Sequence, residues 1–141
     1  MDFDFIFVIF RGTLSVKSTI KDARVLRKNV DTTEGIDEGS VHLGFLENLD
    51  QAFARICYCI ANIQKEHNNP CKIISTGHSL GGAMATILAQ RLEYKAGHDV
   101  NTLFTYGSPR VGGPIFSQWC DANLNHQRFV NNNDVVPCVP T

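Results

Sequence analysis

The segment Gly77-His78-Ser79-Leu80-Gly81 places a serine at the centre of a G-x-S-x-G motif. The sequence predicts a short buried strand before it, over residues 72–75, and a helix after it, from Leu80. In that setting the motif presents the serine hydroxyl as a nucleophile, and its glycines let strand and helix approach each other closely. The unpaired N–H groups at the helix start favour a developing negative charge. The simpler alternative is a strand–helix turn that happens to carry a serine.

A serine nucleophile needs a base, an orienting acid and donors for the oxyanion. Among the acidic residues after Ser79, only Asp134 follows the carboxyl end of a predicted strand, at the sheet edge where Ser79 lies. Asp134 is therefore the candidate acid, the alternative being an aspartate that caps an Asn-rich turn. The backbone N–H of Leu80 is the first candidate oxyanion donor. Thr13, at the end of another predicted strand, is the second.

The base is the member of this set that the sequence does not supply. The chain contains five histidines, and all of them precede Asp134. His78 is next to Ser79, but a side chain at that position of the turn should point away from the hydroxyl. His126 is no more than a secondary candidate, because it begins the last predicted strand at the end away from Asp134. We therefore expect no working catalytic histidine within the 141 residues.

The elements that must position these residues alternate between strands and helices. Strands are predicted over residues 4–10, 72–75, 100–106 and 127–131, and helices over 46–63, over 80–94 and from Pro114; a short helix over 14–23 and a strand over 23–30 have weaker patterns. This alternation predicts an α/β fold with a mostly parallel sheet and helices on both of its faces. The apolar run Phe5–Phe10 is typical of a strand that is buried on both faces.

Composition predicts one folded domain over residues 1–141. Hydrophobic residues make up 43% of the chain and charged residues 19%, as in globular proteins. The formal net charge of -1 gives no electrostatic reason to expect a nucleic acid or an anionic membrane surface as partner. The longest apolar run is too short to cross a bilayer. Asp2 and Asp4 occupy the place of a basic signal-peptide region, which predicts a cytoplasmic protein, or a secreted one if an upstream segment is missing.

The cysteines give little sign of metal or disulfide chemistry. There are five, an odd number, at positions 57, 59, 71, 120 and 138, and no C-x-x-C spacing occurs. No cluster of suitably spaced ligands predicts a metal site, and nothing implies a cofactor. We expect buried free thiols at most of these positions. A disulfide that involves Cys71, Cys120 or Cys138 stays open.

Five blocks of the sequence together resemble the class 3 lipases, the fungal triacylglycerol lipase type within the α/β-hydrolases. In the order of the family they are Phe10-Arg11-Gly12-Thr13, Val41-His42-Leu43-Gly44-Phe45, Gly77-His78-Ser79-Leu80-Gly81-Gly82-Ala83, Thr105-Tyr106-Gly107-Ser108-Pro109-Arg110-Val111-Gly112 and Asn133-Asp134-Val135-Val136-Pro137. The resemblance implies that Ser79 is the nucleophile and Asp134 the acid, and that Thr13 and Leu80 form the oxyanion hole.

The same resemblance implies a function and further roles. It implies a serine hydrolase of carboxylic esters, with acylglycerols as substrates and a lipid interface as the place of action. It places a lid over residues 14–22, and it marks His42, His78, Tyr106 and Pro109 as site-shaping residues.

The chain departs from the family pattern in two places. The catalytic histidine of the family lies well downstream of the acid, and the seven residues after Asp134 include none. The sequence is therefore expected to be the core of the fold without its C-terminal part. The predicted lid is poor in apolar residues, which leaves open a soluble esterase for short acyl chains or a feruloyl-type esterase. A lipase-like interaction or signalling module without turnover is the alternative from another class.

Overall fold

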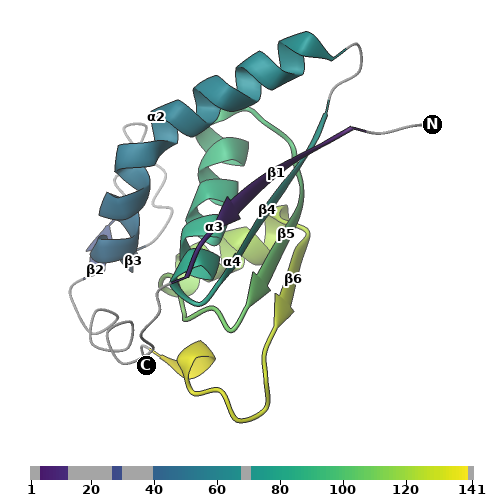
Figure 1. Cartoon of the computed structure of the whole chain (residues 1–141). Coiled ribbons are helices and arrows are strands. Elements are labelled where there is room, and N and C mark those ends of the chain that lie inside the picture. Colours follow the sequence, from purple (N-terminus) through teal and green to yellow (C-terminus); the bar gives the residue numbers. More distant parts are fainter. Residues whose placement is uncertain (1–3, 13–26, 30–39, 68–70, 140–141) are drawn as a thin grey trace.

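Four parallel strands form the main sheet of the molecule (Figure 1). The computed structural model describes residues 4–12, 27–29, 40–67 and 71–139. The strand order is β1-β4-β5-β6, with bounds β1 Phe5–Phe10, β4 Lys72–His78, β5 Val100–Tyr106 and β6 His126–Phe129. A separate antiparallel pair joins β2 (Arg27–Asn29) to β3 (Ser40–His42). The predicted α/β fold with a mainly parallel sheet is confirmed.

Three α-helices of the described segments connect the strands of the main sheet. They are α2 (Leu43–Glu66), α3 (Leu80–Arg91) and α4 (Pro114–Asn123). A π-helical turn, Leu92–Ala96, continues α3 and ends at Gly97, whose φ of 64° is in the left-handed region, as the sequence predicted for a helix cap. The proline of α4 stands at its first turn, as predicted.

Helix α3 occupies the centre of the core, between the sheet and α2. The helix is buried nearly all round, and its small residues Ala83, Ala85 and Ala89 have no exposed area, so α3 packs closely against β4 and β5. The apolar side of α2 covers α3, and Leu49 and Ile60 of that side are fully buried. The apolar side that the periodicity predicted for α2 therefore faces the core.

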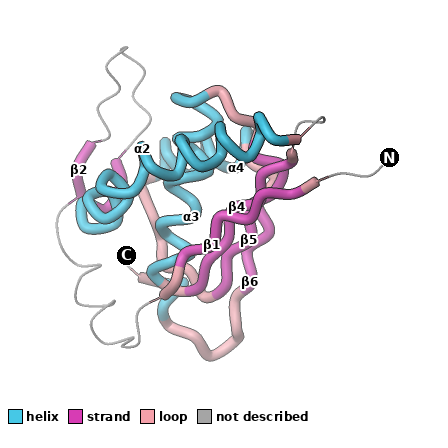
Figure 2. Tube along the Cα trace, turned by 45° about the horizontal axis from the view of Figure 1, so that its top comes forward, coloured by secondary structure: helices cyan, strands magenta, loops and turns pink. Residues whose placement is uncertain are grey.

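The helices lie on one face of the sheet in the part of the chain that the structure describes (Figures 1 and 2). On β1, Ile6 is 7% exposed, whereas Phe7 and Ile9 are 59% and 71% exposed. The prediction of a β1 buried on both faces is therefore wrong, and the prediction of helices on both faces holds for one face only. The reason is topological: β1 is an edge strand here, and α2, α3 and α4 all return on the same side.

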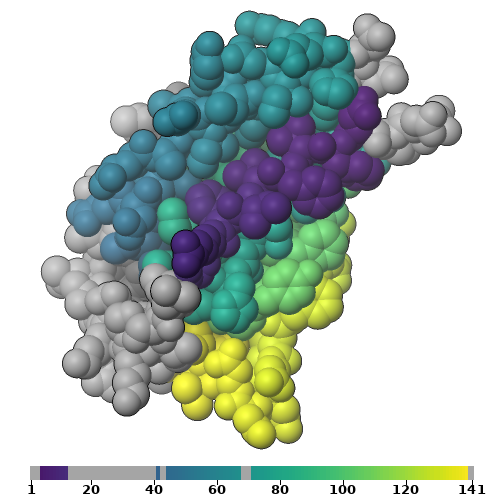
Figure 3. Space-filling view, in the orientation of Figure 1, coloured from purple at the N-terminus to yellow at the C-terminus, as the bar shows by residue number. Residues whose placement is uncertain are grey.

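The strands β1, β4, β5 and β6 lie side by side on the uncovered face (Figure 3), and Phe7, Ile9, Tyr106 and Phe129 are exposed apolar side chains there. Tyr106 and Phe129 stack there with ring centroids 5.0 Å apart, and both are about half exposed. Exposed large apolar side chains on one face of a sheet are notable, because proteins in water rarely leave a large apolar patch open.

Several predicted boundaries shift or fall outside the described residues. Strand β4 extends three residues beyond its prediction, and β6 begins one residue before its prediction and ends two before it. The predicted helix over residues 14–23 and the lid over 14–22 lie outside the described residues. No helix of the described segments is both long enough and apolar enough to span a membrane.

All five cysteines are free, so the open possibility of a disulfide is not realised. Cys71 and Cys120 are buried, Cys57 is half-buried, and Cys59 and Cys138 are exposed. The expectation of free thiols is confirmed, and that of burial holds for two of them.

Isoleucines on opposite faces of the sheet should differ in their contribution to stability. Ile73, which is 1% exposed, packs under α3, whereas Ile9 stands on the uncovered face. We expect Ile73→Ala to lower the free energy of unfolding by about 2–5 kcal/mol, because it leaves a cavity in the core. Ile9→Ala should change it by less than about 1 kcal/mol. Urea denaturation of both variants tests this, and equal losses would contradict the one-sided core.

Candidate active site

Ser79 forms a strained turn between β4 and α3. Its φ of 55° and ψ of -123° make it the one non-glycine residue with positive φ among the described residues. Backbone of this kind costs about 1–3 kcal/mol and persists where the surrounding structure enforces it. Two hydrogen bonds fix the turn: Ser79 N–H donates to the Tyr106 carbonyl at 2.9 Å, and Gly82 N–H donates to the Ser79 carbonyl at 2.9 Å. This is the geometry of a nucleophile elbow.

The glycines of the motif make the turn possible through close backbone contacts. A Cβ atom on Gly77 would overlap the carbonyl of Gly81, and one on Gly81 would overlap the carbonyl of Phe10 at the end of β1. A Cβ atom on Gly82 would stand 2.8 Å from Cβ of Ser108, which follows β5. The first turn of α3 thus packs against β4 as the motif predicted, and also against the ends of β1 and β5.

The hydroxyl of Ser79 is buried and has no hydrogen-bond partner among the described residues. The residue is 3% exposed. A buried hydroxyl without a partner costs about 1–3 kcal/mol, so such groups are rare outside functional sites. The alternative of a turn that merely carries a serine explains neither the strained backbone nor this unsatisfied oxygen.

Of the two predicted oxyanion donors, Leu80 is among the described residues and Thr13 is not. Leu80 is the first residue of α3, so its N–H belongs to the helix N-terminus, where intrahelical partners are lacking. Thr13 lies outside the described residues. Gly12, the residue before it, is described, and a Cβ atom there would stand 2.6 Å from the His78 carbonyl. The chain after β1 therefore passes directly beside the elbow.

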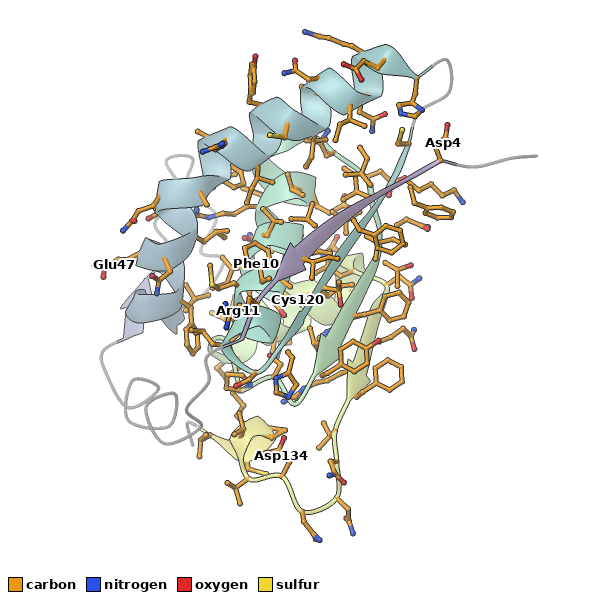
Figure 4. The ribbon with its side chains drawn as sticks, viewed as in Figure 1. Asp4, Phe10, Arg11, Glu47, Cys120 and Asp134 are labelled. Atoms are coloured by element: carbon orange, nitrogen blue, oxygen red, sulfur yellow. The ribbon has the colours of Figure 1, made fainter. Side chains whose placement is uncertain are left out.

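Asp134 reaches the same edge of the sheet from the loop after β6 (Figure 4). Its Oδ1 accepts the Val136 N–H at 3.0 Å, which is the turn-capping role that the sequence left as an alternative. Its Oδ2 lies over Gly107, at 2.8 Å from where a Cβ atom would be. Tyr106, the last residue of β5, accepts the hydrogen bond of the Ser79 N–H, and Gly107 follows it directly. The carboxylate therefore lies one residue beyond the partner of the elbow. One oxygen thus fixes the loop, and the other lies beside Gly107.

Gly107 is the site residue to which sequence reasoning gave no role. Its φ of 55° is in the left-handed region, and its N–H donates to the Phe129 carbonyl at 2.9 Å. A side chain there would push against the carboxylate of Asp134. The signal for it was a glycine directly after a predicted strand, in the Tyr106-Gly107-Ser108 segment.

Neither of the two histidines considered for the base serves Ser79. His126 begins β6 opposite Leu103, three residues before the end of β5, and its Nε2 lies 2.8 Å from Oγ1 of Thr105. His78 ends β4 with its ring between Gly12 and Gly107, and no hydrogen bond joins it to Ser79 or Asp134. The placement of His126 gives its secondary candidacy no support.

Comparison with known proteins decides the family. The model of the family described as Lipase (class 3) matches residues 7–141. This chain belongs to the class 3 lipase family. It is 34% identical over 139 residues to a lipase of Rhizopus niveus, covering 96% of this chain and 34% of that protein. It is 36% identical over 136 residues to secreted mono- and diacylglycerol lipase 1 of Fusarium solani, covering 96% of this chain and 39% of that protein.

The fold agrees with solved lipase structures. The crystal structure of a lipase from Rhizopus microsporus var. chinensis superposes with a TM-score of 0.85 at 31% identity, over 97% of this chain and 48% of that one. The chain thus spans little more than a third of its relatives by sequence and about half of that structure. The family resemblance inferred from the five sequence blocks is confirmed.

A methyl group at the elbow should destabilise the fold. We expect Gly81→Ala to lower the free energy of unfolding by about 1–3 kcal/mol or more, because its Cβ would overlap the end of β1. Gly44→Ala, in the first turn of α2 with open space around its Cα, should leave stability unchanged or raise it by up to about 1 kcal/mol. Thermal and urea denaturation measure both, and a neutral Gly81→Ala would refute the close packing.

Protonation of His126 should weaken the fold. Burial, followed by the positive charge of Arg128, lowers the pKa of His126, and Asp121 opposes this in part. The unfolded chain then binds the proton more readily, so stability is full above the ordinary histidine pKa and falls as the pH drops through about 6.5. We expect the wild type to lose stability between pH 7.5 and 5.5, and His126→Gln to lose less. Identical pH profiles would contradict this.

Proposed function

We propose that this chain carries the nucleophile, the orienting acid and the oxyanion hole of a serine ester hydrolase acting on acylglycerols. The observation that carries the proposal is the buried, unpartnered hydroxyl of Ser79 on a strained elbow at the start of α3. Membership of the class 3 lipase family supports the reaction class. The acylglycerol substrate is inferred from the names of the relatives, among them the Fusarium mono- and diacylglycerol lipase.

The proposed reaction follows from the placement of the groups. Ser79 Oγ attacks the ester carbonyl and gives its proton to a base, forming a tetrahedral intermediate. The N–H of Leu80 at the helix N-terminus, with Thr13 from the segment after β1, holds the negative oxygen. The alcohol leaves with the proton from the base, and water then releases the acyl group from the serine. Asp134 orients the base through the oxygen that does not cap its own loop.

The base is proposed to be a histidine outside these 141 residues, in the chain order Ser, Asp, His of the α/β-hydrolases. Among the described side chains, none lies within hydrogen-bonding distance of the Ser79 hydroxyl. The 141 residues alone should therefore hydrolyse esters slowly, through the oxyanion hole and binding. The lid over residues 14–22, and with it action at a lipid interface, remains part of the proposal and lies outside the described residues.

Added imidazole should supply the missing base. We expect the 141-residue chain to hydrolyse p-nitrophenyl butyrate slowly, and imidazole to raise the rate at least about tenfold above that of Ser79→Ala in the same buffer, since general base catalysis contributes about 10²–10⁴-fold. The Ser79→Ala variant subtracts the reaction of imidazole with the ester itself.

Three outcomes would overturn parts of the proposal. Equal rates for the wild type and Ser79→Ala at every imidazole concentration would favour the silent interaction module. A fast reaction without imidazole would show that a base is present among the 141 residues. Rescue that is the same in Asp134→Asn as in the wild type would remove Asp134 from the site.

A further inference from the structure

Three potential metal ligands meet at the edge of the sheet opposite the elbow. Asp4 precedes β1, His67 follows α2, and Cys71 precedes β4. The parallel pairing of β1 with β4 starts at Phe5 and Lys72, and Lys72 N–H donates to the Asp4 carbonyl at 2.9 Å. Figure 4 shows Asp4 at the far end of β1 from Phe10 and Arg11. Eight residue steps through β4 separate Cys71 from Ser79, about 26 Å at the rise of a strand.

The ligand atoms lie close to the spacing that a mononuclear metal site needs. One donor atom from each of the three residues lies within 4.8 Å of the other two, and His67 Nδ1 stands 2.9 Å from Asp4 Oδ2. Two ligands of one tetrahedral zinc stand about 3.3–3.8 Å apart, given bond lengths of about 2.0–2.3 Å. Side-chain shifts of about 1 Å or less therefore suffice to bring all three donors onto one ion.

The backbone around the cluster is held in place by a further interaction. Gln64, in the last turn of α2, donates from Nε2 to the Cys71 carbonyl at 2.9 Å and accepts the Cys71 N–H on Oε1 at 2.8 Å. This pair of hydrogen bonds fixes the backbone of Cys71 to Gln64 at the end of α2. Gln64 lies three residues before His67. The thiol is buried at 6% exposure, whereas Asp4 and His67 are exposed. The cluster thus has a sheltered sulfur and an open side facing water.

The ligand types select the ion. Thiolate sulfur, imidazole nitrogen and carboxylate oxygen together are the donor set of zinc and of similar late transition metals, not of calcium or magnesium. We propose that Asp4, His67 and Cys71 bind one divalent cation of the zinc class, with the fourth coordination position open to water. The ion would join the edge strand β1, which among the described strands pairs with β4 alone, to the end of α2.

Without a cation, the cluster is a hydrogen-bonded His67–Asp4 pair beside a protonated thiol. Burial, and then the negative charge of Asp4, raises the pKa of Cys71. A cation reverses this effect, since it stabilises the thiolate: the Sγ–H bond breaks, the sulfur–metal bond forms, and one proton passes to the buffer. Binding should therefore tighten as the pH rises.

Titration of the untagged, metal-free 141-residue chain with zinc chloride under reducing conditions tests the proposal. Calorimetry should give one zinc per chain, with release of a proton that depends on Cys71. Cys71→Ser, His67→Gln and Asp4→Asn should each weaken binding at least tenfold. The matched controls Cys59→Ser, an exposed cysteine of α2, and His98→Gln, a histidine of the loop after the π-helical turn, should bind as the wild type does.

Cobalt(II) supplies a readout that reports on the sulfur. It should give a thiolate-to-metal charge-transfer band in the wild type and in Cys59→Ser, and none in Cys71→Ser. Absence of stoichiometric binding, a wild-type affinity in His67→Gln, or binding without the thiolate band would overturn the site. Because His67 is exposed, its replacement should leave the fold intact, so the test holds even if Cys71→Ser fails to fold.

Discussion

Strand β4 and helix α3 approach each other at Ser79 so closely that no side chain fits between them. The missing Cβ atoms of Gly77 and Gly81 allow the contact, and the carbonyl of Phe10 at the end of β1 closes the space from the other side. With no room to relax, Ser79 is kept at positive φ, a conformation that would cost about 1–3 kcal/mol in a free chain. The same wedge exposes the first N–H groups of α3 to whatever binds at the serine.

The other site residues depend on this contact through the end of β5. Tyr106 accepts the hydrogen bond from Ser79 and Gly107 donates to Phe129, so one strand end connects the elbow with the loop that carries Asp134. The parallel arrangement brings the elbow and the Asp134 loop together, because all carboxyl ends of parallel strands meet at one edge of the sheet. The amino ends meet at the other edge, and the same parallel pairing brings Asp4 next to Cys71 there.

The main sheet carries its described helices on one face, and the chain matches part of a larger lipase structure. An α/β sheet normally carries helices on both faces, yet Phe7 and Ile9 of β1 are exposed here and the described helices share one side. The chain corresponds to 48% of the Rhizopus microsporus lipase structure. Among the described residues, the contacts of the elbow come from β1, β4, β5 and α3, so the geometry of the nucleophile does not depend on the second face.

Sequence by itself determined the parts of this protein that depend on neighbouring residues. The glycines around Ser79, the period of the apolar residues in α2 and the order of the five motif blocks identified the elbow, the helices and the family, because each pattern is local. Tertiary structure alone decided which side of β1 is buried, that Gly107 seats the carboxylate of Asp134, and that His126 turns to Thr105. It also brought Asp4 to His67 and Cys71 across more than sixty residues, where no spacing rule applied. These features arise from strand pairing and helix return, which join residues far apart in the chain and leave no periodic trace in it.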